Sequence, residues 1–415
     1  MVLLYGFGIR CLRLIYWIAA AFNAKARAFR NGRRDQQKKL HDTFPLAAGT
    51  KLVWIHCASL GEFEQGRPVI EALKRWNPDI KILLTFFSPS GYEVRKNYEQ
   101  ADYVFYLPWD TRTNAGWFAT QVKPTLAIFV KYEFWYHYAT ELHRRNIPLI
   151  SVSSIFRADQ PFFKLYGGVF RSILKGFDHF FVQNHESADL LHAINIQPVT
   201  VAGDTRFDRV NQIIQQGGEI QVAKRFKNDQ KLMVVGSAWP DDMEVLLPFI
   251  NENRNRLKFI VAPHEISEDF IRGVEQGIEG KCVRYSKAET SPLEDASVLI
   301  VDNVGLLSRL YRYGEFAFVG GAYGDGLHNI LEAACYGIPI FFGNKAFQKF
   351  QEAVDLVLRG GAFEVANFVE LKAKYELMTQ HPEQVLLARE VTQHYVKENL
   401  GATTKIVDYC KKFLS

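Results

Sequence analysis

Short continuous runs of apolar residues alternate with amphipathic stretches along most of this chain. The first series of runs occupies residues 52–56, 82–87, 103–107, 125–130, 148–153 and 179–183, and the second occupies residues 232–236, 257–262, 298–302, 315–321 and 338–343. Helical periodicity lies between the runs, for example over residues 64–76, 132–145, 186–194, 241–253, 305–311 and 329–336. Buried strands that alternate with helices are typical of a parallel, doubly wound α/β sheet.

The two series are separated by a polar stretch, residues 215–231, and a chain of 415 residues is too long for one core. We therefore expect two Rossmann-like domains that face a cleft, with ligands bound outside the carboxyl ends of the strands. The expected parts are an N-terminal segment at 1–39, a first domain at 40–210, a linker at 211–231, a second domain at 232–380, and C-terminal helices at 381–415 that pack back across the linker.

The N-terminal segment combines a long apolar stretch with most of the excess positive charge. Residues 1–40 carry nine Lys or Arg and one Asp, a net charge of +8, whereas the whole chain has +5. Arg10 and Arg13 interrupt the apolar stretch Met1–Phe22, and each costs about 2.5–3.5 kcal/mol at a bilayer centre. We expect an amphipathic or partly inserted membrane-anchoring helix whose cations lie on anionic head groups. The alternative is an ordinary buried helix.

Composition excludes several classes of protein. Apolar residues make up 48% and charged residues 23%, which is typical of a globular chain and not of a disordered one. The five cysteines never occur as C-x-x-C, so neither a disulfide scaffold nor a structural zinc site is expected. Nucleic-acid binding is disfavoured because the positive charge is confined to one end. H-E-x-x-H, G-x-S-x-G and D-x-D motifs are missing from the sequence, and we expect no metal and no cofactor.

The first candidate for chemistry follows the first expected strand, where residues 56–62 read H-C-A-S-L-G-E. Ser59 and Glu62 have the spacing of a helix capping box, which is one interpretation. The other is that Glu62, at the carboxyl edge of a sheet, acts as a general base toward a hydroxyl group. Gly61 would then let a substrate approach the backbone closely.

The second candidate is a glycine-rich loop between a strand and a helix, G-G-A-Y-G-D-G-L-H-N-I-L-E over residues 320–332. Free backbone N–H groups and a helix N-terminus suit a phosphate group. The spacing is neither G-x-G-x-x-G nor that of the P-loop, which disfavours dinucleotides and ATP. Glu332 is placed to accept hydrogen bonds from ribose hydroxyl groups. The alternative is a plain turn with an acid favoured by the helix dipole.

Three further motifs lie at the ends of expected strands. His264, in V-A-P-H-E, would face the cleft, although a single His at a strand end is more often structural. Arg206, in G-D-T-R-F-D, could stabilise a leaving phosphate or form a salt-bridged turn with its neighbouring acids. Lys131 and Glu133, in K-Y-E-F-W, lie either at the cleft edge or at an exposed helix start.

In these motifs the sequence resembles the 3-deoxy-D-manno-octulosonic acid (Kdo) transferases of lipopolysaccharide synthesis, two-domain enzymes of the glycosyltransferase-B type. The likeness covers nearly the whole chain and includes G-S-A-W-P-D-D-M-E beside the motifs above, all in the family's order. It implies transfer of Kdo from CMP-Kdo to the lipid A precursor (lipid IVA) at the cytoplasmic face of the bacterial inner membrane. The alternatives are another membrane-associated enzyme of this fold that uses a UDP-sugar, and an inactive nucleotide-binding membrane protein.

The resemblance also implies roles for individual residues. Glu62 corresponds to the catalytic base, and Arg206 stands where the family usually has a Lys that stabilises the transition state. Glu133 matches the acid of a family E-L-W-P element, and Lys131 stands where that element begins with an acid. His264 follows Pro263 directly, where the family usually has an Arg, a change typical of a divergent branch. The residues expected to bind the donor nucleotide are Pro263, His264, Gly305, Leu306, Leu307, Gly320, Gly321, Asn329, Ile330, Leu331 and Glu332.

Overall fold

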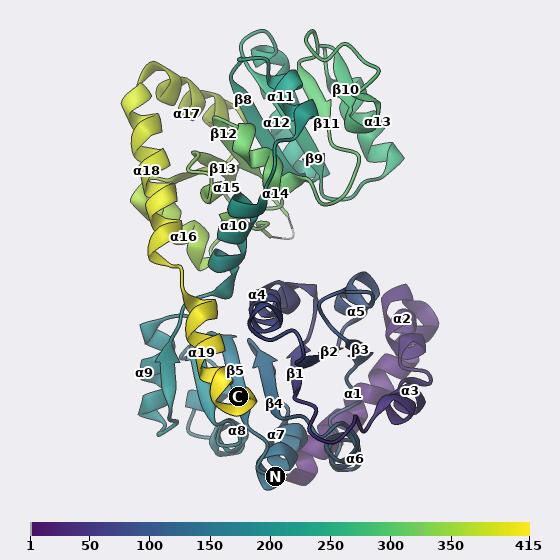
Figure 1. Ribbon diagram of the computed structural model, residues 1–415. Helices are drawn as coiled ribbons and strands as arrows, with labels where there is room; N and C mark the ends of the chain where they lie inside the picture. Colours follow the sequence, from purple (N-terminus) through teal and green to yellow (C-terminus); the bar gives the residue numbers. More distant parts are fainter. Residues whose placement is uncertain (1, 325) are drawn as a thin grey trace. The chain divides into compact units, whose positions relative to one another are not determined.

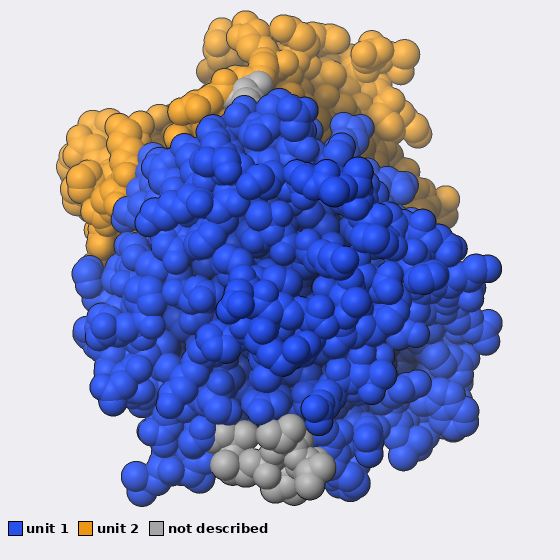
Figure 2. Space-filling model, turned by 60° about the horizontal axis from the view of Figure 1, so that its bottom comes forward, with its two compact units in different colours: residues 1–209, 400–415 blue, residues 210–399 orange. Residues whose placement is uncertain are grey.

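The computed structural model describes residues 2–324 and 326–415, and the chain divides into two compact units (Figure 1). Unit 1 comprises residues 1–209 and 400–415, and unit 2 comprises residues 210–399 (Figure 2). Unit 2 is therefore an insertion in the sequence of unit 1. Each unit has its own parallel sheet with helices on both faces, which confirms the expected α/β class with two Rossmann-like domains.

The described residues of unit 1 form a seven-stranded parallel sheet with the order β3-β2-β1-β4-β5-β6-β7. Strand β1 pairs with β2 on one side and with β4 on the other, so the strand order reverses at β1. The strands are β1 (Leu52–Cys57), β2 (Lys81–Phe86), β3 (Tyr103–Tyr106), β4 (Leu126–Val130), β5 (Leu149–Ser154), β6 (His179–Val182) and β7 (Val199–Val201). The helices are α1 (Val2–Phe22), α2 (Ala24–Gly32), α3 (Gln36–Thr43), α4 (Leu60–Trp76), α5 (Pro89–Arg95), α6 (Arg112–Val122), α7 (Tyr136–Arg144), the 3₁₀ helix η1 (Pro161–Phe163), α8 (Gly168–Leu174), α9 (His185–Ala193) and α19 (Ala402–Leu414).

Both faces of this sheet are buried because side chains of a strand alternate between them. Trp54 of β1 packs on one face with Phe118 of α6 and Tyr138 of α7. Val53 and Ile55 lie in the core of the opposite face, to which α4 and α19 contribute. Continuous apolar strands are the consequence, and they are the reason why the strand positions could be predicted.

Helix α19 returns the chain to unit 1, whereas α18 stays in unit 2. Asp208 caps the N-terminus of α19, because its two carboxylate oxygens accept hydrogen bonds from Gly401 N and Thr403 N, each at 2.7 Å. Ile406 and Cys410 are fully buried in the core that α19 shares with α4. Asp208 lies just before the chain leaves unit 1, and it therefore binds the first turn of the helix with which the chain re-enters unit 1.

The described residues of unit 2 form a second seven-stranded parallel sheet, ordered β10-β11-β9-β8-β12-β13-β14, in which the order reverses at β8. The strands are β8 (Leu232–Ala238), β9 (Lys258–Pro263), β10 (Cys282–Arg284), β11 (Val298–Ile300), β12 (Phe316–Val319), β13 (Ile340–Gly343) and β14 (Ala362–Val365). The helices are α11 (Gln221–Lys227), α12 (Pro240–Asn253), α13 (Glu268–Gly277), η2 (Tyr285–Lys287), α14 (Leu307–Leu310), η3 (Tyr311–Tyr313), α15 (Leu331–Ala334), α16 (Gln351–Arg359), α17 (Phe368–Gln380) and α18 (Pro382–Glu398), while α10 (Thr205–Gln216) spans the boundary between the units.

Some helical expectations differ from the structure. The helix expected over residues 329–336 is reduced to the single turn α15, followed by non-helical turns up to Gly337. The helix expected over residues 305–311 is the short α14 followed by η3. Residues 211–231, expected as a linker, contain the end of α10 and all of α11, whose Ala223 and Phe226 are fully buried. The sequence signal for α11 that we missed is the presence of these apolar residues between polar ones.

The N-terminal helices α1, α2 and α3 are part of unit 1 and pack against its other elements. Ile9, Phe29 and Trp109 form a small buried cluster, and Tyr5 Oη donates a hydrogen bond of 2.6 Å to the buried carboxylate of Asp110. Among the described residues, none of the helices has both the length and the apolar character that crossing a bilayer requires. The expected membrane-anchoring helix is therefore not supported as an inserted span, and α1 is instead part of a folded unit.

Candidate functional site

Some of the predicted site residues lie where the strand order of each sheet reverses, whereas Arg206 follows β7, His264 follows β9 and the Gly305 loop follows β11. Loops that leave the two sides of such a point diverge and make room for a ligand at the carboxyl ends of the strands. In unit 1 these loops follow β1 and β4 and contain residues 58–62 and 131–135. In unit 2 they follow β8 and β12 and contain Trp239 and the glycine-rich loop.

The turn from β1 into α4 holds Glu62 by a complete capping box. Glu62 Oε2 accepts hydrogen bonds from Ser59 N at 3.1 Å and from the Ser59 hydroxyl, and Gly61 N donates to Ser59 Oγ at 3.2 Å. The side chain is half-buried, and within the described residues Glu62 Oε1 accepts no hydrogen bond. One oxygen therefore fixes the carboxylate at the edge of the sheet while the other stays available, so the two interpretations of Glu62 are compatible.

The loop after β4 contributes Glu133 to a buried network. Glu133 Oε2 accepts a hydrogen bond from Trp135 Nε1 at 2.7 Å and lies 3.1 Å from His56 Nε2. On its other side, His56 Nδ1 lies 2.9 Å from Thr85 Oγ1 of β2. Glu133 is only 9% exposed and His56 is fully buried. The network ties the ends of β1, β2 and β4 together, which gives Glu133 a supporting position behind the surface of the edge.

Lys131 lies directly after β4 with a backbone φ of 68°, a left-handed conformation that side chains other than glycine rarely adopt. The strain is held by hydrogen bonds on both sides of the residue: Lys131 N donates to Val152 O at 2.9 Å, and Ser154 Oγ donates to Lys131 O at 3.0 Å. Its half-buried side chain reaches over the ring of Tyr132, with Nζ at 5.5 Å from the ring centroid. Lys131 thus places a cation at the carboxyl end of β4, next to the carboxyl end of β1 after which Glu62 lies.

Arg206 is oriented by Asp204, as the salt-bridge alternative predicted. Asp204 Oδ2 accepts hydrogen bonds from Arg206 Nε at 2.9 Å, from Arg206 Nη2 at 2.8 Å and from Gln65 Nε2 of α4 at 3.0 Å. Burial by itself raises the pKa of Asp204, but the Arg206 charge and these hydrogen bonds outweigh burial, and the net pKa is lowered. The guanidinium is therefore fixed relative to the helix that carries Glu62.

Three aromatic rings meet at the corresponding edge of unit 2. Trp239 Nε1 donates a hydrogen bond of 2.8 Å to His328 Nε2, and the planes of the two rings are nearly parallel, at 17° to each other. His264, after β9, stacks on Trp239 with ring centroids 4.2 Å apart, and its ring is tilted by 33° against that of His328 at 4.4 Å. Burial, and to a smaller extent the nearby His264, lowers the pKa of His328 to about 4. The result is a stacked platform whose outer ring, His264, is exposed.

The glycine-rich loop is held against this platform by Asp242 of α12. Asp242 Oδ2 accepts hydrogen bonds from Trp239 N and from Gly321 N, both at 2.9 Å. A Cβ atom on Gly320 would lie 2.3 Å from Ser237 O and 2.5 Å from Asp242 Oδ2, so only glycine fits there. Burial raises the pKa of Asp242 to about 6, and the neighbouring Asp241 adds a smaller effect in the same direction. Asp325, in the same loop, lies outside the described residues.

The segment after the loop contains both core residues and residues whose side chains can reach a ligand. Ile330 and Leu331 are fully buried, so their predicted contact with a nucleotide could involve only the backbone. Asn329 and Glu332 are half-buried and linked, since Asn329 Nδ2 donates to Glu332 Oε1 at 3.2 Å. Gly305 adopts a φ of 93°, and its loop is exposed. Because α15 is a single turn, its dipole is weaker than the expected longer helix would have supplied.

Comparison with known proteins identifies the family. A family model described as 3-deoxy-D-manno-octulosonic-acid transferase (kdotransferase) matches residues 25–209. The 3-deoxy-D-manno-octulosonic acid transferase of Aquifex aeolicus is 30% identical over 330 residues, which are 78% of this chain and 84% of that protein. This chain belongs to the Kdo transferase family. The family member of Chlamydophila psittaci is 26% identical over 359 residues, 82% of this chain and 80% of that protein. The chain is accordingly a glycosyltransferase.

Solved structures show the same fold as this Kdo transferase family member. The UDP-GlcNAc 2-epimerase of Neisseria meningitidis matches with a TM-score of 0.61 at 13% identity, over 88% of this chain and all (100%) of that chain. The corresponding epimerase of Methanocaldococcus jannaschii matches with a TM-score of 0.53 at 14% identity, over 84% and 99%. At these identities the likeness concerns the fold alone, and it agrees with the glycosyltransferase-B type predicted from the sequence.

Several residues of the two edges were not predicted as site residues of the Kdo transferase. His56 and Trp135 fix Glu133, while Trp239, His328 and Asp242 build the unit 2 platform. Three of them carried a positional signal, because Trp239 follows a strand directly and His56 and His328 lie within motifs already singled out. Within the described parts of the chain, no group of three or more His, Cys, Asp and Glu is arranged to hold a metal ion.

Proposed function

We propose that this Kdo transferase family member transfers Kdo from CMP-Kdo to a hydroxyl group of the lipid A precursor, at the cytoplasmic face of the bacterial inner membrane. Unit 1 supplies the base and unit 2 holds the nucleotide. Family membership supports the sugar and the reaction class. The observation that carries the mechanism is the carboxylate of Glu62, fixed through Oε2 at the reversal point of a sheet with Oε1 free of protein hydrogen bonds among the described residues.

In the proposed reaction Glu62 takes the proton of the acceptor hydroxyl. The hydroxyl oxygen then forms a bond to the anomeric carbon of Kdo, while the bond from that carbon to the phosphate oxygen of CMP breaks and its electron pair leaves with CMP. The backbone N–H groups of the glycine-rich loop and the oriented cation Arg206 offer compensation for the charge on the leaving phosphate, which needs no metal. Lys131 adds a second cation at the edge of Glu62.

The stacked platform supports the assignment of a nucleotide to unit 2. Aromatic faces stack on nucleobases and contribute about 1–3 kcal/mol per base, and His264 presents such a face at the surface of the platform. His264 stands where the family usually has an Arg, so stacking replaces part of the missing cationic contact in this proposal. Pro263 is the last residue of β9 and the Gly305 loop follows β11, so both lie at the carboxyl ends of strands of this sheet.

Two observations support association with a membrane surface. The outward face of α1 carries large exposed apolar side chains, and basic residues follow it directly. A helix of this kind lies in the plane of the interface and does not cross the bilayer. The exposed apolar residues are Phe7, Leu14, Ile15, Trp17, Ile18 and Phe22.

The test of the reaction is mass spectrometry of lipid IVA incubated with CMP-Kdo and the purified protein. We expect mass increases of one or more Kdo residues for the wild type, and a rate roughly 10²- to 10⁴-fold lower for Glu62→Gln. Glu64→Gln is the matched control, because Glu64 lies on the same helix but pairs with Arg95 at 3.0 Å. A Glu62→Gln rate close to that of Glu64→Gln at saturating substrates would exclude Glu62 as the base.

A UDP-sugar is the alternative donor, since the Neisseria meningitidis epimerase, which shares the fold, has been solved bound to UDP-GlcNAc. Thermal-shift titration with CMP and with UDP separates the two donors, because a ligand stabilises the native state by mass action, about 2.7 kcal/mol at a concentration of 100 Kd. We expect stabilisation by CMP at concentrations at which UDP has no effect. An inactive nucleotide-binding protein would show the CMP effect without any mass increase of lipid IVA.

A further inference from the structure

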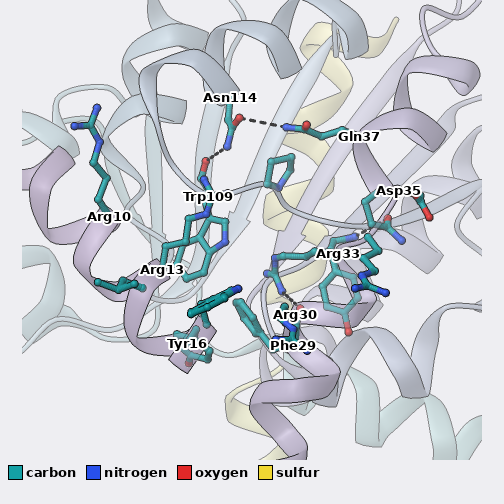
Figure 3. A pocket seen from close by; sticks show the side chains of 16 residues that line it. Arg10, Arg13, Tyr16, Phe29, Arg30, Arg33, Asp35, Gln37, Trp109 and Asn114 are labelled. Atoms are coloured by element: carbon teal, nitrogen blue, oxygen red, sulfur yellow. Dashed lines mark hydrogen bonds between the residues drawn. The ribbon is translucent and has the colours of Figure 1, made fainter. Parts of the chain in front are cut away.

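A pocket of about 730 Å³ lies within unit 1, bounded by α1, α2, the start of α3 and the loop after β3 (Figure 3). Figure 3 shows Arg10 and Arg13 of α1 on one side of the pocket and Arg30 of α2 and Arg33, directly after α2, on the other, with the rings of Tyr16, Phe29 and Trp109 near the middle. Five of the lining residues are arginines, and one, Asp35, is an acid. The arginines are Arg10, Arg13, Arg30, Arg33 and Arg34.

Arg33 is the fixed cation of this pocket. Its guanidinium carbon lies 3.6 Å from the ring centroid of Phe29 and 4.7 Å from that of Tyr106, and Nη2 donates to Phe87 O at 2.6 Å. Its Nε atom is buried without a hydrogen-bond partner. A guanidinium held in this way is partly desolvated, and within the described residues no acid pairs with it, which favours binding of an anion that can share its charge.

The other four arginines are exposed, and within the described residues none of their side chains makes a hydrogen bond or an ion pair. Five cations around one cavity repel one another, and Asp35 can compensate for only one of them. A phosphate group offers two negative charges and several acceptor oxygens to guanidinium groups at once. The charge pattern therefore fits a phosphate-bearing ligand better than a neutral one.

The apolar side chains of the pocket indicate which chemical group the ligand carries besides a phosphate. Leu14 and Trp17 line the pocket and are 57% and 62% exposed, and the apolar outward face of α1 continues from them. A soluble phosphate would leave this surface in water, whereas the acyl chains of a lipid would cover it. Cations and exposed apolar side chains on one surface thus match a phosphorylated amphiphile.

The pocket lies on the same sheet edge as the candidate base. Its wall residue Trp109 packs on Phe87, with ring centroids 5.4 Å apart, and Phe87 packs on Trp135 at 5.0 Å. Trp135 in turn donates its hydrogen bond to Glu133. These residues follow β3, β2 and β4, so a continuous row of rings joins the pocket to the end of the sheet at which Glu62 lies.

From this arrangement we infer that the pocket binds the phosphate group of an acylated lipid and thereby positions the lipid acceptor on unit 1. The inference rests on the proposed function for the identity of the bound lipid as the acceptor. It gives α1 and α2 a direct part in acceptor binding, beyond attachment to a membrane surface.

The test uses the full-length protein and monomeric dodecyl phosphate as the probe, with affinity measured by isothermal titration calorimetry. The pocket variant is Arg10→Gln/Arg13→Gln/Arg30→Gln. The matched control is Lys25→Gln/Lys38→Gln/Lys39→Gln, which removes the same charge from exposed residues of the same segment outside the pocket. We expect dodecyl phosphate to bind the wild type and the control alike, and the pocket variant roughly 10- to 100-fold more weakly, because three exposed ionic contacts are lost.

Inorganic phosphate and dodecyl maltoside distinguish the sources of the binding. Inorganic phosphate that bound as tightly as dodecyl phosphate would assign the pocket to a soluble anion and overturn the lipid assignment. Equal binding of dodecyl maltoside, or equal losses in the pocket variant and its control, would show that the arginines are not the recognition element.

The transfer reaction gives a second readout. With lipid IVA as acceptor, the pocket variant should raise the KM for the acceptor and leave the KM for CMP-Kdo unchanged, and circular dichroism should show a native fold. Equal KM changes for both substrates would contradict an acceptor site. If the wild type transferred no Kdo at all, the proposed function would fail, while the dodecyl phosphate titration would still decide whether the pocket binds a lipid phosphate.

Discussion

Two groups that contact Trp239, the buried Asp242 and the half-buried His328, should make opposite contributions to the pH dependence of unit 2 stability. Asp242 accepts a hydrogen bond from the Trp239 backbone, and its pKa is raised by burial from 3.8 to about 6. His328 accepts one from the Trp239 indole, and its pKa is lowered by burial from 6.5 to about 4. Asp241 and His264 are the nearest titratable neighbours and shift both groups further in the same directions.

The sign of each contribution follows from the protons bound in the native and unfolded states. The contribution of Asp242 to native-state stability is fully present below its unfolded pKa of 3.8, and it is lost as the pH rises through its native pKa of about 6. His328 stabilises fully above its unfolded pKa of 6.5, and this stability is lost as pH falls through about 4. Between pH 4 and 6 each group changes the free energy of unfolding by about 1.4 kcal/mol per pH unit, or about 3 kcal/mol in total. The two slopes are opposite and nearly cancel.

Single substitutions should reveal the hidden slopes. In Asp242→Asn, which keeps an oxygen acceptor, the free energy of unfolding should rise with pH relative to wild type by about 3 kcal/mol between pH 4 and 6. In His328→Gln it should fall by a similar amount over the same window. Asp242→Asn/His328→Gln should restore the shallow wild-type profile. Urea unfolding followed by tryptophan fluorescence at half-unit pH steps measures all four curves, and Trp239 itself contributes to the signal.

The comparison rests on differences from wild type, so the titration of all other groups cancels. If the curve for Asp242→Asn ran parallel to that of wild type from pH 4 to 7, the carboxylate would titrate alike in both states, and the reasoning from its burial would be wrong. A double variant that kept the slope of one single variant would refute the cancellation.

Three further predictions follow from contacts described above. Gly320→Ala should lower the free energy of unfolding by about 1–3 kcal/mol and weaken CMP binding in a thermal-shift assay, because its Cβ would meet a backbone oxygen at 2.3 Å. The control is Gly273→Ala, on an exposed helix where a Cβ has no atom within 4 Å; it should raise the free energy of unfolding by about 0.5–1 kcal/mol. Asp208→Ala should cost about 0.5–2 kcal/mol in urea unfolding through loss of the α19 cap, and an unchanged midpoint would contradict the cap. Leu14→Ser/Ile18→Ser should reduce co-sedimentation with anionic vesicles and leave CMP affinity unchanged, and full sedimentation would show that another surface docks.

The strands were predictable because both faces of each parallel sheet are covered. Every apolar run expected as a strand is one, since a doubly buried strand has no polar positions to interrupt the run. The strands β7, β10 and β14 were missed, and all three lie at sheet edges, where burial is partial and the sequence alternates or is short. Local spacing also predicted the capping box at Ser59 and Glu62.

The candidate site was less predictable where it depends on contacts between distant segments. Trp239, His264 and His328 come from three separate loops, and their stacking follows from the strand order and not from any local pattern. The same holds for the arginine pocket, since the row of charges in residues 1–39 indicated a flat surface interaction. The packing of α1 and α2 on Trp109 turned part of that surface into a cavity.

The capped end of α19 has a consequence for the order in which the nascent chain folds. Because residues 210–399 leave the ribosome before α19 does, unit 2 can complete its sheet while the core of unit 1 still lacks Ile406 and Cys410. The usual vectorial order, in which the N-terminal domain folds first, is therefore reversed at the final step. Until α19 docks and Asp208 binds its first turn, the apolar face of α4 stays open to solvent, a surface suited to a chaperone during synthesis.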